Sequence, residues 1–540
     1  MAKQMLKSSE ARKEIIKGLN KLADIVEVTQ GPKGRNVLIE KEWGEAVCTQ
    51  DGVTVARSVL LKNKFENMGA QAGTNASIKT NDETGDATTA TIGLARAMTS
   101  EGEKYSELGI SALGIRKGMK KATNALTKEL GEMTIEIKDK NQIKQIATIA
   151  AKDEEIGTIV SDIMDKVGKA GVVNVEKGQT NIIEQEIVEG FRFDKGFVSP
   201  YMATDRDKGI AEFNEPYILI TDKAITDVNT LLPIMEKLVK LPQGAIKQLA
   251  IICGDIGGDA LMTLVVNNAN GSYRGLAIKA PYYGDKQKAT LEDIAILTGG
   301  KLITQDINLE LKNIKIEDLG QAKKIIVTKD TTTIIEGKGD KDLVVDRIVD
   351  IEKQEKAEKS DFLKEILRER LGRLSGVVGV IKVGANSEIE QKDLELRIED
   401  AISAAQAALE EGIVIGGGLA LIKARHSALA NKQTFTSDEE EKGWEIVMKA
   451  VERPFYQILI NAGEKPDVIL DKIQNDKNSN LGFNADTGKY VDMFKEGITD
   501  STKSIRCALK NACSTAEMIL ATEGVICLEE VDTQKPTVTM

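Results

Sequence analysis

The character of this 540-residue sequence changes along the chain and then changes back. Residues 1–132 and 412–540 carry apolar side chains at spacings of three and four, which is typical of helices. Residues 190–376 alternate strand and helix patterns, and the segments between, 133–189 and 377–411, are mixed. A chain that leaves one pattern and returns to it indicates nested domains, with an α/β domain inserted between two halves of a helical one.

Composition narrows the function classes. The net charge is −11, from 84 acidic against 73 basic residues, which argues against nonspecific binding of nucleic acid or of anionic membranes. The five cysteines are odd in number and lack CxxC spacing, so we expect no disulfide framework and no zinc site. The single histidine, His426, is expected on the surface, and no apolar run approaches the roughly 18 residues that a membrane helix needs. These features favour a cytoplasmic protein.

The stretch Thr80–Met98 is the first candidate site. It places Asp86 directly after a glycine, follows it with threonines, and continues into a helical Ala/Leu/Ile/Met run. Aspartate is a good N-cap because its carboxylate accepts hydrogen bonds from the free amides of the first turn. A helix start with free amides and small hydroxyls is also a place where phosphate binds. An ordinary capped helix and a phosphate site are therefore both open on pattern alone.

A second candidate lies earlier in the chain. Residues Thr29–Asn36 hold two glycines, a proline and two basic side chains, which suits either a phosphate-cradling loop or a plain turn, since the spacing is not that of a Walker loop. A hairpin is expected over 36–40 and 46–50. It delivers Asp51-Gly52, and an alternating stretch follows over Val53–Leu61.

Local signals predict further elements. A helix is expected over Ala112–Leu130, and Thr290 with Asp293 forms a capping-box pattern that would open a helix over Leu291–Leu297. One long charged helix is expected from about Leu343 to Arg373. Glycines at the changes of pattern mark candidate hinges, namely Gly190, Gly376 and Gly412.

Several segments, taken together, resemble one family. In order along the chain they are TQGPKGRNV, QDGVTVA, FENMGAQ, the GD-threonine stretch, DKGFVSPYM, KAPYYGD, LGQAKKIIVTKDTTTI, IKVGANSE, RIEDAI, EEGIVIGGGLALI and FNADTGKYVDM. This set is similar to that of the group I chaperonins, the GroEL or 60-kDa heat-shock type, and the resemblance runs from about residue 3 to residue 530.

The resemblance implies a multidomain, mixed α and β fold. A mostly helical equatorial domain would take 1–132 and 412–540, a small α/β intermediate domain 133–189 and 377–411, and an α/β apical domain 190–376. It further implies a homo-oligomer in heptameric rings, stacked in pairs, which enclose non-native polypeptides under a GroES-like co-chaperonin lid. ATP, Mg²⁺ and, as a further candidate ion, K⁺ would be its cofactors.

The resemblance also transfers roles to positions of this sequence. Asp51 and Asp400 would be catalytic, with Asp400 orienting or activating the attacking water, and Asp86 would hold the magnesium ion. The nucleotide would be lined by Thr29, Gln30, Gly31, Pro32, Asp86, Ala87, Thr88, Thr89, Ala90, Gly417, Asn484, Ala485 and Asp500.

A polypeptide- and co-chaperonin-binding groove is expected in the inserted domain. Leu261, Val265 and Val266 share one face of a predicted helix, and Leu232 and Met235 share a face of another. Taken alone, such stripes favour a buried core, and it is the resemblance that implies an exposed apolar groove formed by two of them side by side. The full set is Phe197, Tyr201, Met202, Leu232, Met235, Leu261, Val265 and Val266.

The sequence departs from the family pattern inside the candidate site. Ala87 and Ala90 stand where the family has a glycine and a threonine, Gln30 replaces a leucine, and Val377 follows Gly376 at a hinge that has paired glycines in the family. We expect ATP hydrolysis to survive with an altered rate or nucleotide affinity. The alternative is a ring-forming holdase or assembly protein with weak or absent hydrolysis.

Overall fold

The computed structural model describes residues 3–40, 46–168, 172–178, 180–206, 209–241, 248–270, 274–304, 311–358, 360–431 and 433–528. These residues fall into two units. The first is drawn from 1–165, 177–182 and 383–540, and the second from 166–176 and 183–382. The predicted nesting is confirmed, because the second unit interrupts the first. The three-domain division remains a prediction.

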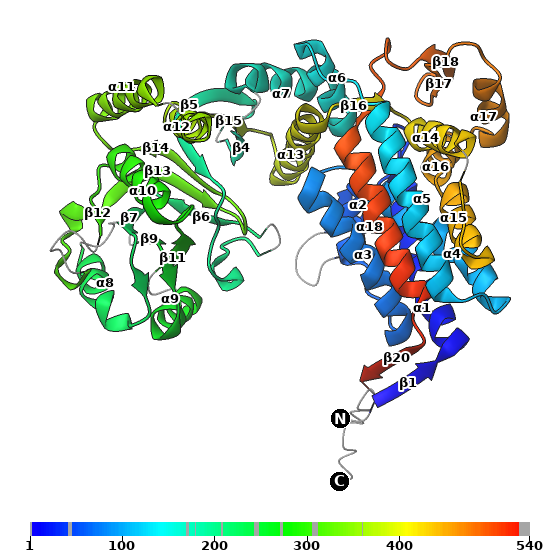
Figure 1. Ribbon diagram of the computed structural model, residues 1–540, viewed down its shortest axis with the longest axis horizontal. Helices are drawn as coiled ribbons and strands as arrows, with labels where there is room; N and C mark the ends of the chain where they lie inside the picture. Colours follow the sequence, from blue (N-terminus) through cyan, green and yellow to red (C-terminus); the bar gives the residue numbers. More distant parts are fainter. Residues whose placement is uncertain are drawn as a thin grey trace, which may run out of the picture. The chain divides into compact units, whose positions relative to one another are not determined.

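Long helices dominate the first unit (Figure 1). Its helices are α1 (Ser8–Val26), α2 (Gly52–Ser58), α3 (Lys64–Thr84), α4 (Thr88–Glu107), α5 (Ala112–Glu132), α6 (Lys140–Ala151), α7 (Glu154–Val167), α13 (Glu388–Glu411), α14 (Leu419–Ala430), α15 (Asp438–Ala450), α16 (Arg453–Asn461), α17 (Pro466–Gln474) and α18 (Thr502–Leu520). Helix α18 packs against α3, α4 and α5, and α1 packs against α3. The core is aliphatic, as the low aromatic content of 4% requires.

The first unit also contains short two-stranded sheets. They pair β1 (Lys3–Lys7) with β20 (Gly524–Leu528), β2 (Val37–Ile39) with β3 (Val47–Thr49), β16 (Ile413–Ile415) with β19 (Thr499–Ser501), and β17 (Leu481–Asn484) with β18 (Lys489–Asp492). The β2–β3 pair is the predicted hairpin. The alternating stretch after Gly52 begins as helix α2 instead, because Asp51 caps it by accepting hydrogen bonds from the amides of Val53 and Thr54.

The second unit is built on a ten-stranded mixed sheet (Figure 1). The strands are β4 (Val172–Lys177), β5 (Glu184–Phe193), β6 (Ala211–Asn214), β7 (Tyr217–Thr221), β9 (Gln248–Cys253), β11 (Arg274–Lys279), β12 (Leu302–Ile303), β13 (Gly320–Val327), β14 (Thr332–Gly337) and β15 (Val377–Val383). The main path runs β11-β9-β7-β13-β14-β5-β15-β4. The helices are α8 (Leu232–Val239), α9 (Gly258–Asn270), α10 (Gly284–Thr298), α11 (Lys341–Ala357) and α12 (Asp361–Leu374). The predicted fold class is therefore correct.

Two local predictions in the second unit are wrong. The capping-box pattern lies inside α10, which begins six residues earlier: the Thr290 hydroxyl donates to the Lys286 carbonyl. Asp293 is buried and instead accepts hydrogen bonds from Arg347 and Arg370. The long charged helix is two helices, α11 and α12, because Ser360 starts the second one by accepting a hydrogen bond from the Leu363 amide.

The candidate hinge glycines have distinct settings. Strand β5 runs without a break through Gly190, and the long segment of the second unit begins at residue 183, before this glycine. The Gly190 amide donates to the Gly376 carbonyl at 3.1 Å, which places these two glycines side by side. Gly412 has a φ of 79° and ends α13 where β16 begins. Across the described ranges, no helix combines the length and the apolar character needed to cross a membrane.

Candidate functional site

Two helix N-termini, those of α2 and α4, meet in the first unit. Gly52, the first residue of α2, has no room for a side chain: a Cβ there would lie 2.2 Å from the Thr89 hydroxyl and 3.2 Å from the Thr88 hydroxyl. The backbone of α2 therefore packs directly on the threonines that open α4. The Asp51 carboxylate is fixed beside them by amides of Val53, at 3.1 Å, and Thr54, at 2.8 Å.

The turn between α3 and α4 leaves the start of α4 open. Gly85 ends α3 with a φ of 63°, and Ala87 precedes α4 with a φ of 60°, so both occupy the left-handed region. The predicted capping role of Asp86 is wrong, since its carboxylate accepts from the Ala87 amide at 2.6 Å and not from the first turn. No side chain caps the first turn of α4. Its amides are therefore free to bind an anion.

The loop that begins at Thr29 approaches the same place. The Thr29 and Thr89 hydroxyl oxygens are 3.4 Å apart, and the Thr29 hydroxyl donates to the Val26 carbonyl. Gly31 has a φ of 84°, and a Cβ there would lie 3.1 Å from the Ile458 side chain on α16. The loop thus needs a glycine at this position, and the structure brings it to the start of α4.

Carboxylates from distant parts of the chain converge here. Burial raises the pKa of Asp400, on α13, well above its ordinary value, and the charges of Asp51 and Asp86 raise it further. Burial also raises the pKa of Asp86, and the same cause, with the charge of Asp86, raises the pKa of Asp500 to about 7. These four aspartates form one electrostatic cluster. Its negative charges repel one another, which favours a cation at this site.

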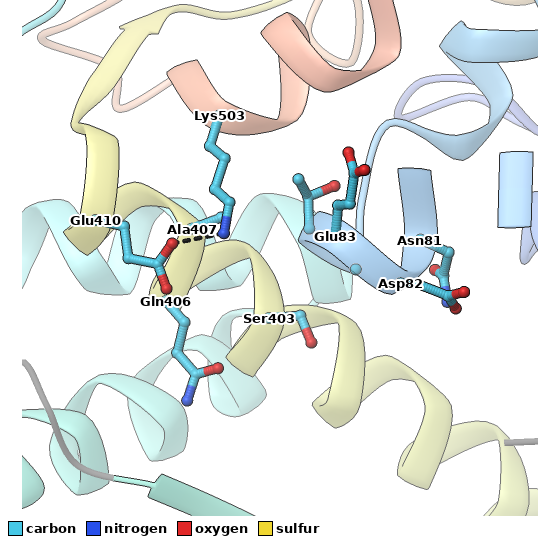
Figure 2. A pocket seen from close by; sticks show the side chains of 10 residues that line it. Asn81, Asp82, Glu83, Ser403, Gln406, Ala407, Glu410 and Lys503 are labelled. Carbon is cyan, nitrogen blue, oxygen red and sulfur yellow. Dashed lines mark hydrogen bonds and ion pairs between the residues drawn. The ribbon is translucent and has the colours of Figure 1, made fainter. Parts of the chain in front are cut away.

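Helix α13 reaches the cluster through a close contact. A Cβ on Gly85 would lie 2.0 Å from the Ser403 Cβ, so α13 touches the backbone of the turn before Asp86. Ser403 is one helical turn after Asp400. A polar cavity of about 130 Å³ opens beside this contact (Figure 2). Figure 2 shows Ser403 and Gln406 along α13, and Glu410 paired with Lys503 of α18.

Lys152 is a member of the cluster that sequence reasoning missed. It is in the left-handed region, with a φ of 55°, between α6 and α7. Its ammonium donates to the Gln50 side chain at 3.0 Å and is attracted by Asp400, Asp51 and Asp86. Burial and the Arg397 guanidinium lower the pKa of Lys152. The only sequence signal was a short polar break between two helical patterns.

Arg397 fixes the turn that carries Lys152. Its guanidinium donates to the Ala151 carbonyl at 2.9 Å and to the Asp153 carboxylate at 3.0 Å. Arg397 lies one turn before Asp400 on α13. Helix α13 therefore carries Asp400 and, through Arg397, also positions Lys152.

Asp500, Gly417 and Asn484 lie on or just after the short strands of the first unit. In the β16–β19 pair Val414 is opposite Asp500, and Gly417 follows β16 with a φ of 67°. A Cβ on Gly417 would lie 3.1 Å from Met493. Asn484 ends β17, where its side chain accepts from the amides of the following turn.

A model described as the TCP-1/cpn60 chaperonin family matches residues 22–530. The chain belongs to this family. The resemblance drawn from the sequence segments is thereby confirmed, and the match spans both units.

Two solved structures have the same fold as this chaperonin. They are two crystal forms of the chaperonin gp146 from the bacteriophage EL 2 (Pseudomonas aeruginosa), both determined in the presence of ATP-BeFx. Each is 21% identical, and the alignment covers 97% of this chain and 99% of the phage chain. The TM-scores are 0.70 for crystal form II and 0.63 for crystal form I.

The second unit of this chaperonin carries an exposed apolar surface that only partly matches the predicted groove. Tyr201 is 71% exposed, Val266 52% and Leu232 37%, and Phe197, Leu261 and Val265 are half-buried. Met202 and Met235 were predicted to line the groove but are buried: each belongs to the core of the sheet domain. Met262, which is 65% exposed and lies one turn before Val266 on α9, was not predicted.

Proposed function

We propose that this chaperonin binds and hydrolyses ATP at the junction of α2 and α4 and uses the cycle to fold enclosed polypeptides. The observation that carries the proposal is the pairing of an uncapped helix start with four clustered aspartates. The free amides and the Thr88 and Thr89 hydroxyls suit phosphate oxygens. The carboxylates suit a hard divalent cation that accompanies them.

Magnesium fits the donor set of this cluster. Asp86 would hold the ion, with Asp51 beside it, and an ion there would offset the repulsion that raises the pKa of Asp400. Within the described ranges, no three His, Cys, Asp or Glu side chains form a complete ion site. The remaining ligands would therefore be phosphate oxygens and water, the arrangement that Mg²⁺ prefers. When bound, the ion supplies charge neutralisation at the phosphates; K⁺ is a further candidate for this region.

The chain's own groups divide the remaining work. Burial and the charges of Asp51 and Asp86 raise the pKa of Asp400 well above its ordinary value, which makes the carboxylate more basic and suits it to orient and deprotonate water. Lys152 would place a positive charge beside the terminal phosphate, where it would stabilise the negative charge on the phosphate oxygens in the transition state. Thr29, Gln30, Gly31 and Pro32 would line the nucleotide from one side. Ala87, Ala90, Gly417, Asn484, Ala485 and Asp500 would complete the contacts to phosphate, ribose and base.

Family membership supports further proposals about assembly, partners and location. We propose heptameric rings stacked in pairs, a GroES-like lid, and a cytoplasmic location. Non-native polypeptides would bind the exposed apolar surface of the second unit, at Tyr201, Leu232 and Val266 with Phe197, Leu261 and Val265. Electron microscopy of the purified protein with and without ATP tests the ring, and rings of another number would overturn the stoichiometry alone.

A magnesium-dependent ATPase assay tests the central proposal. Asp400→Ala should lower kcat by about 100-fold to 10,000-fold, as expected for loss of a general base, while nucleotide still binds. Asp393→Ala is the matched control, because this half-exposed acid lies two turns earlier on the same helix and pairs only loosely with Arg397, at 3.8 Å. Turnover by the unaltered protein no higher than that of Asp400→Ala would refute an ATPase. If such protein still prevented aggregation, the holdase alternative would stand.

The left-handed conformation of Ala87 helps to distinguish an ATPase from a holdase with weak or absent hydrolysis. The backbone holds the positive φ that a glycine would adopt freely, at a cost of about 1–2 kcal/mol. Loop geometry is thus retained with alanine, which supports hydrolysis at an altered rate. The missing hydroxyl at Ala90 removes one donor near the phosphates, which supports weaker affinity.

A further inference from the structure

A buried charge network lies beneath the loop that begins at Thr29. At its centre is Glu27, which is only 2% exposed and belongs to a short 3-10 helix, Glu27–Thr29, just before the loop. Its carboxylate accepts from Arg96 of α4 at 2.8 Å and from Arg453 of α16 at 2.9 Å. A carboxylate at this position is surrounded by cations and not by the solvent that it prefers.

Helix α4 packs closely against the Glu27 carboxylate. On α4, a Cβ at Gly93 would lie 2.8 Å from a Glu27 carboxylate oxygen. Gly93 thus lets α4 approach the acid closely. Arg96, one turn further along α4, also pairs with Asp24 at 2.7 Å.

The network continues along α16 and returns to the loop. Arg453 donates to the Gln457 side chain at 2.8 Å, and Gln457 donates to the Asn461 side chain at 2.8 Å. The Asn461 amide then donates to two backbone carbonyls, those of Glu27 at 2.8 Å and Gln30 at 2.9 Å. Each link fixes the orientation of the next, because a side-chain amide that accepts on its oxygen must donate through its nitrogen.

We propose that Glu27, Arg453, Gln457 and Asn461 form a clamp that sets the position of the Thr29–Gly31 loop and thereby the affinity for nucleotide. The clamp connects α16 to the loop and to α4, whose first turn carries Thr88 and Thr89. None of its four side chains is among the residues proposed to contact nucleotide or metal, so they are positioning residues. This inference rests on the proposed ATP site.

Asn461 gives the clearest test, since Glu27→Gln would leave two guanidiniums facing a neutral group and could unfold the protein. Asn461→Ala removes both loop contacts and keeps the Glu27 pairs, and Asn461→Asp keeps the shape but cannot donate. Each should weaken ATP and ADP binding about tenfold, which is about 1.4 kcal/mol, with kcat at saturation unchanged. Asn475→Ala is the matched control, because Asn475 also donates to a backbone carbonyl, that of Asp471, at the exposed end of α17.

Hydrogen exchange supplies a readout that does not depend on nucleotide. In the nucleotide-free protein, amides over residues 28–36 should exchange about tenfold faster in Asn461→Ala and Asn461→Asp than in Asn475→Ala. If the unaltered protein binds nucleotide and the Asn461 variants bind it equally well, the clamp is refuted and the ATP site stands. If the unaltered protein binds no nucleotide, the proposed function falls, and the claim on affinity falls with it. Unchanged exchange would refute the clamp in either case.

Discussion

Ala87 offers the sharpest test of the phosphate-site geometry. Its φ of 60° and ψ of 19° are in the left-handed region, which costs an alanine about 1–2 kcal/mol. Ala87→Gly relieves that strain but adds about 0.4–1 kcal/mol of chain entropy and loses part of a half-buried methyl group. The net effect on its own is close to zero or slightly stabilising.

A neighbouring alanine isolates the strain. Ala90 is also half-buried and lies three residues later, inside α4, where glycine costs about 1 kcal/mol relative to alanine. Entropy and methyl loss are similar at the two positions, so their difference reports the left-handed cost. We expect Ala87→Gly to be more stable than Ala90→Gly by about 1–2 kcal/mol.

Native-state hydrogen exchange is the suitable assay, because a chain of two units need not unfold in one step. The opening free energy of amides over residues 88–98 should fall in Ala90→Gly and hold or rise in Ala87→Gly. Equal losses in both variants would show that Ala87 is not left-handed in solution. The turn before α4 would then differ from the one described, and the open helix start with it.

Three further predictions address charged groups. Lys152→Met should lower kcat/KM for ATP by about 10-fold to 100-fold, as expected for a charged hydrogen bond. Lys144→Met, inside the helix α6 that precedes Lys152, should not; equal effects would refute a phosphate contact. Asp293→Asn should destabilise the second unit by about 3–5 kcal/mol in local hydrogen exchange, against under 1 kcal/mol for Glu292→Gln on the exposed side of Arg347; similar losses would contradict a buried pair. Asp500 has a folded-state pKa of about 7, above its unfolded value, so its contribution to stability is greatest near pH 4 and is lost as pH rises through 7. The melting temperature of nucleotide-free protein should therefore fall less between pH 5 and 8 in Asp500→Asn, and parallel curves would refute the shift.

Much of the fold could be predicted because the apolar periodicity and turn residues of individual segments agree with the way these segments pack in the folded protein. The hairpin of β2 and β3 and the helix expected over Ala112–Leu130 are as predicted. The failures share a cause. Thr290 and Asp293 match a capping box, but the half-buried Arg347 and the buried Arg370 donate hydrogen bonds to the aspartate, and no local pattern reveals those arginines.

The site shows the same limit more strongly. The sequence pattern alone did not decide whether Asp86 caps a helix or belongs to a phosphate site. Asp400 was assigned a catalytic role from the family resemblance and not from residue spacing. Lys152 has no motif around it, and its role depends on Arg397, 245 positions later in the chain. Met202 and Met235 were assigned to the groove by resemblance, and exposure of an apolar side chain cannot be deduced from its helix face alone.

The pairing of β1 with β20 has a consequence for how the chain is made. Lys3 is paired with Leu528, and α18, which fills the centre of the helical unit, also lies near the end of the chain. At about 5–20 residues per second, synthesis separates these partners by roughly 25–100 seconds. During that interval the apolar faces of α1, α3 and α4 lack the helix that covers them, and residues 183–382 are synthesised completely before α18 is. A nascent chain of this chaperonin therefore spends about a minute in a state that resembles its own clients.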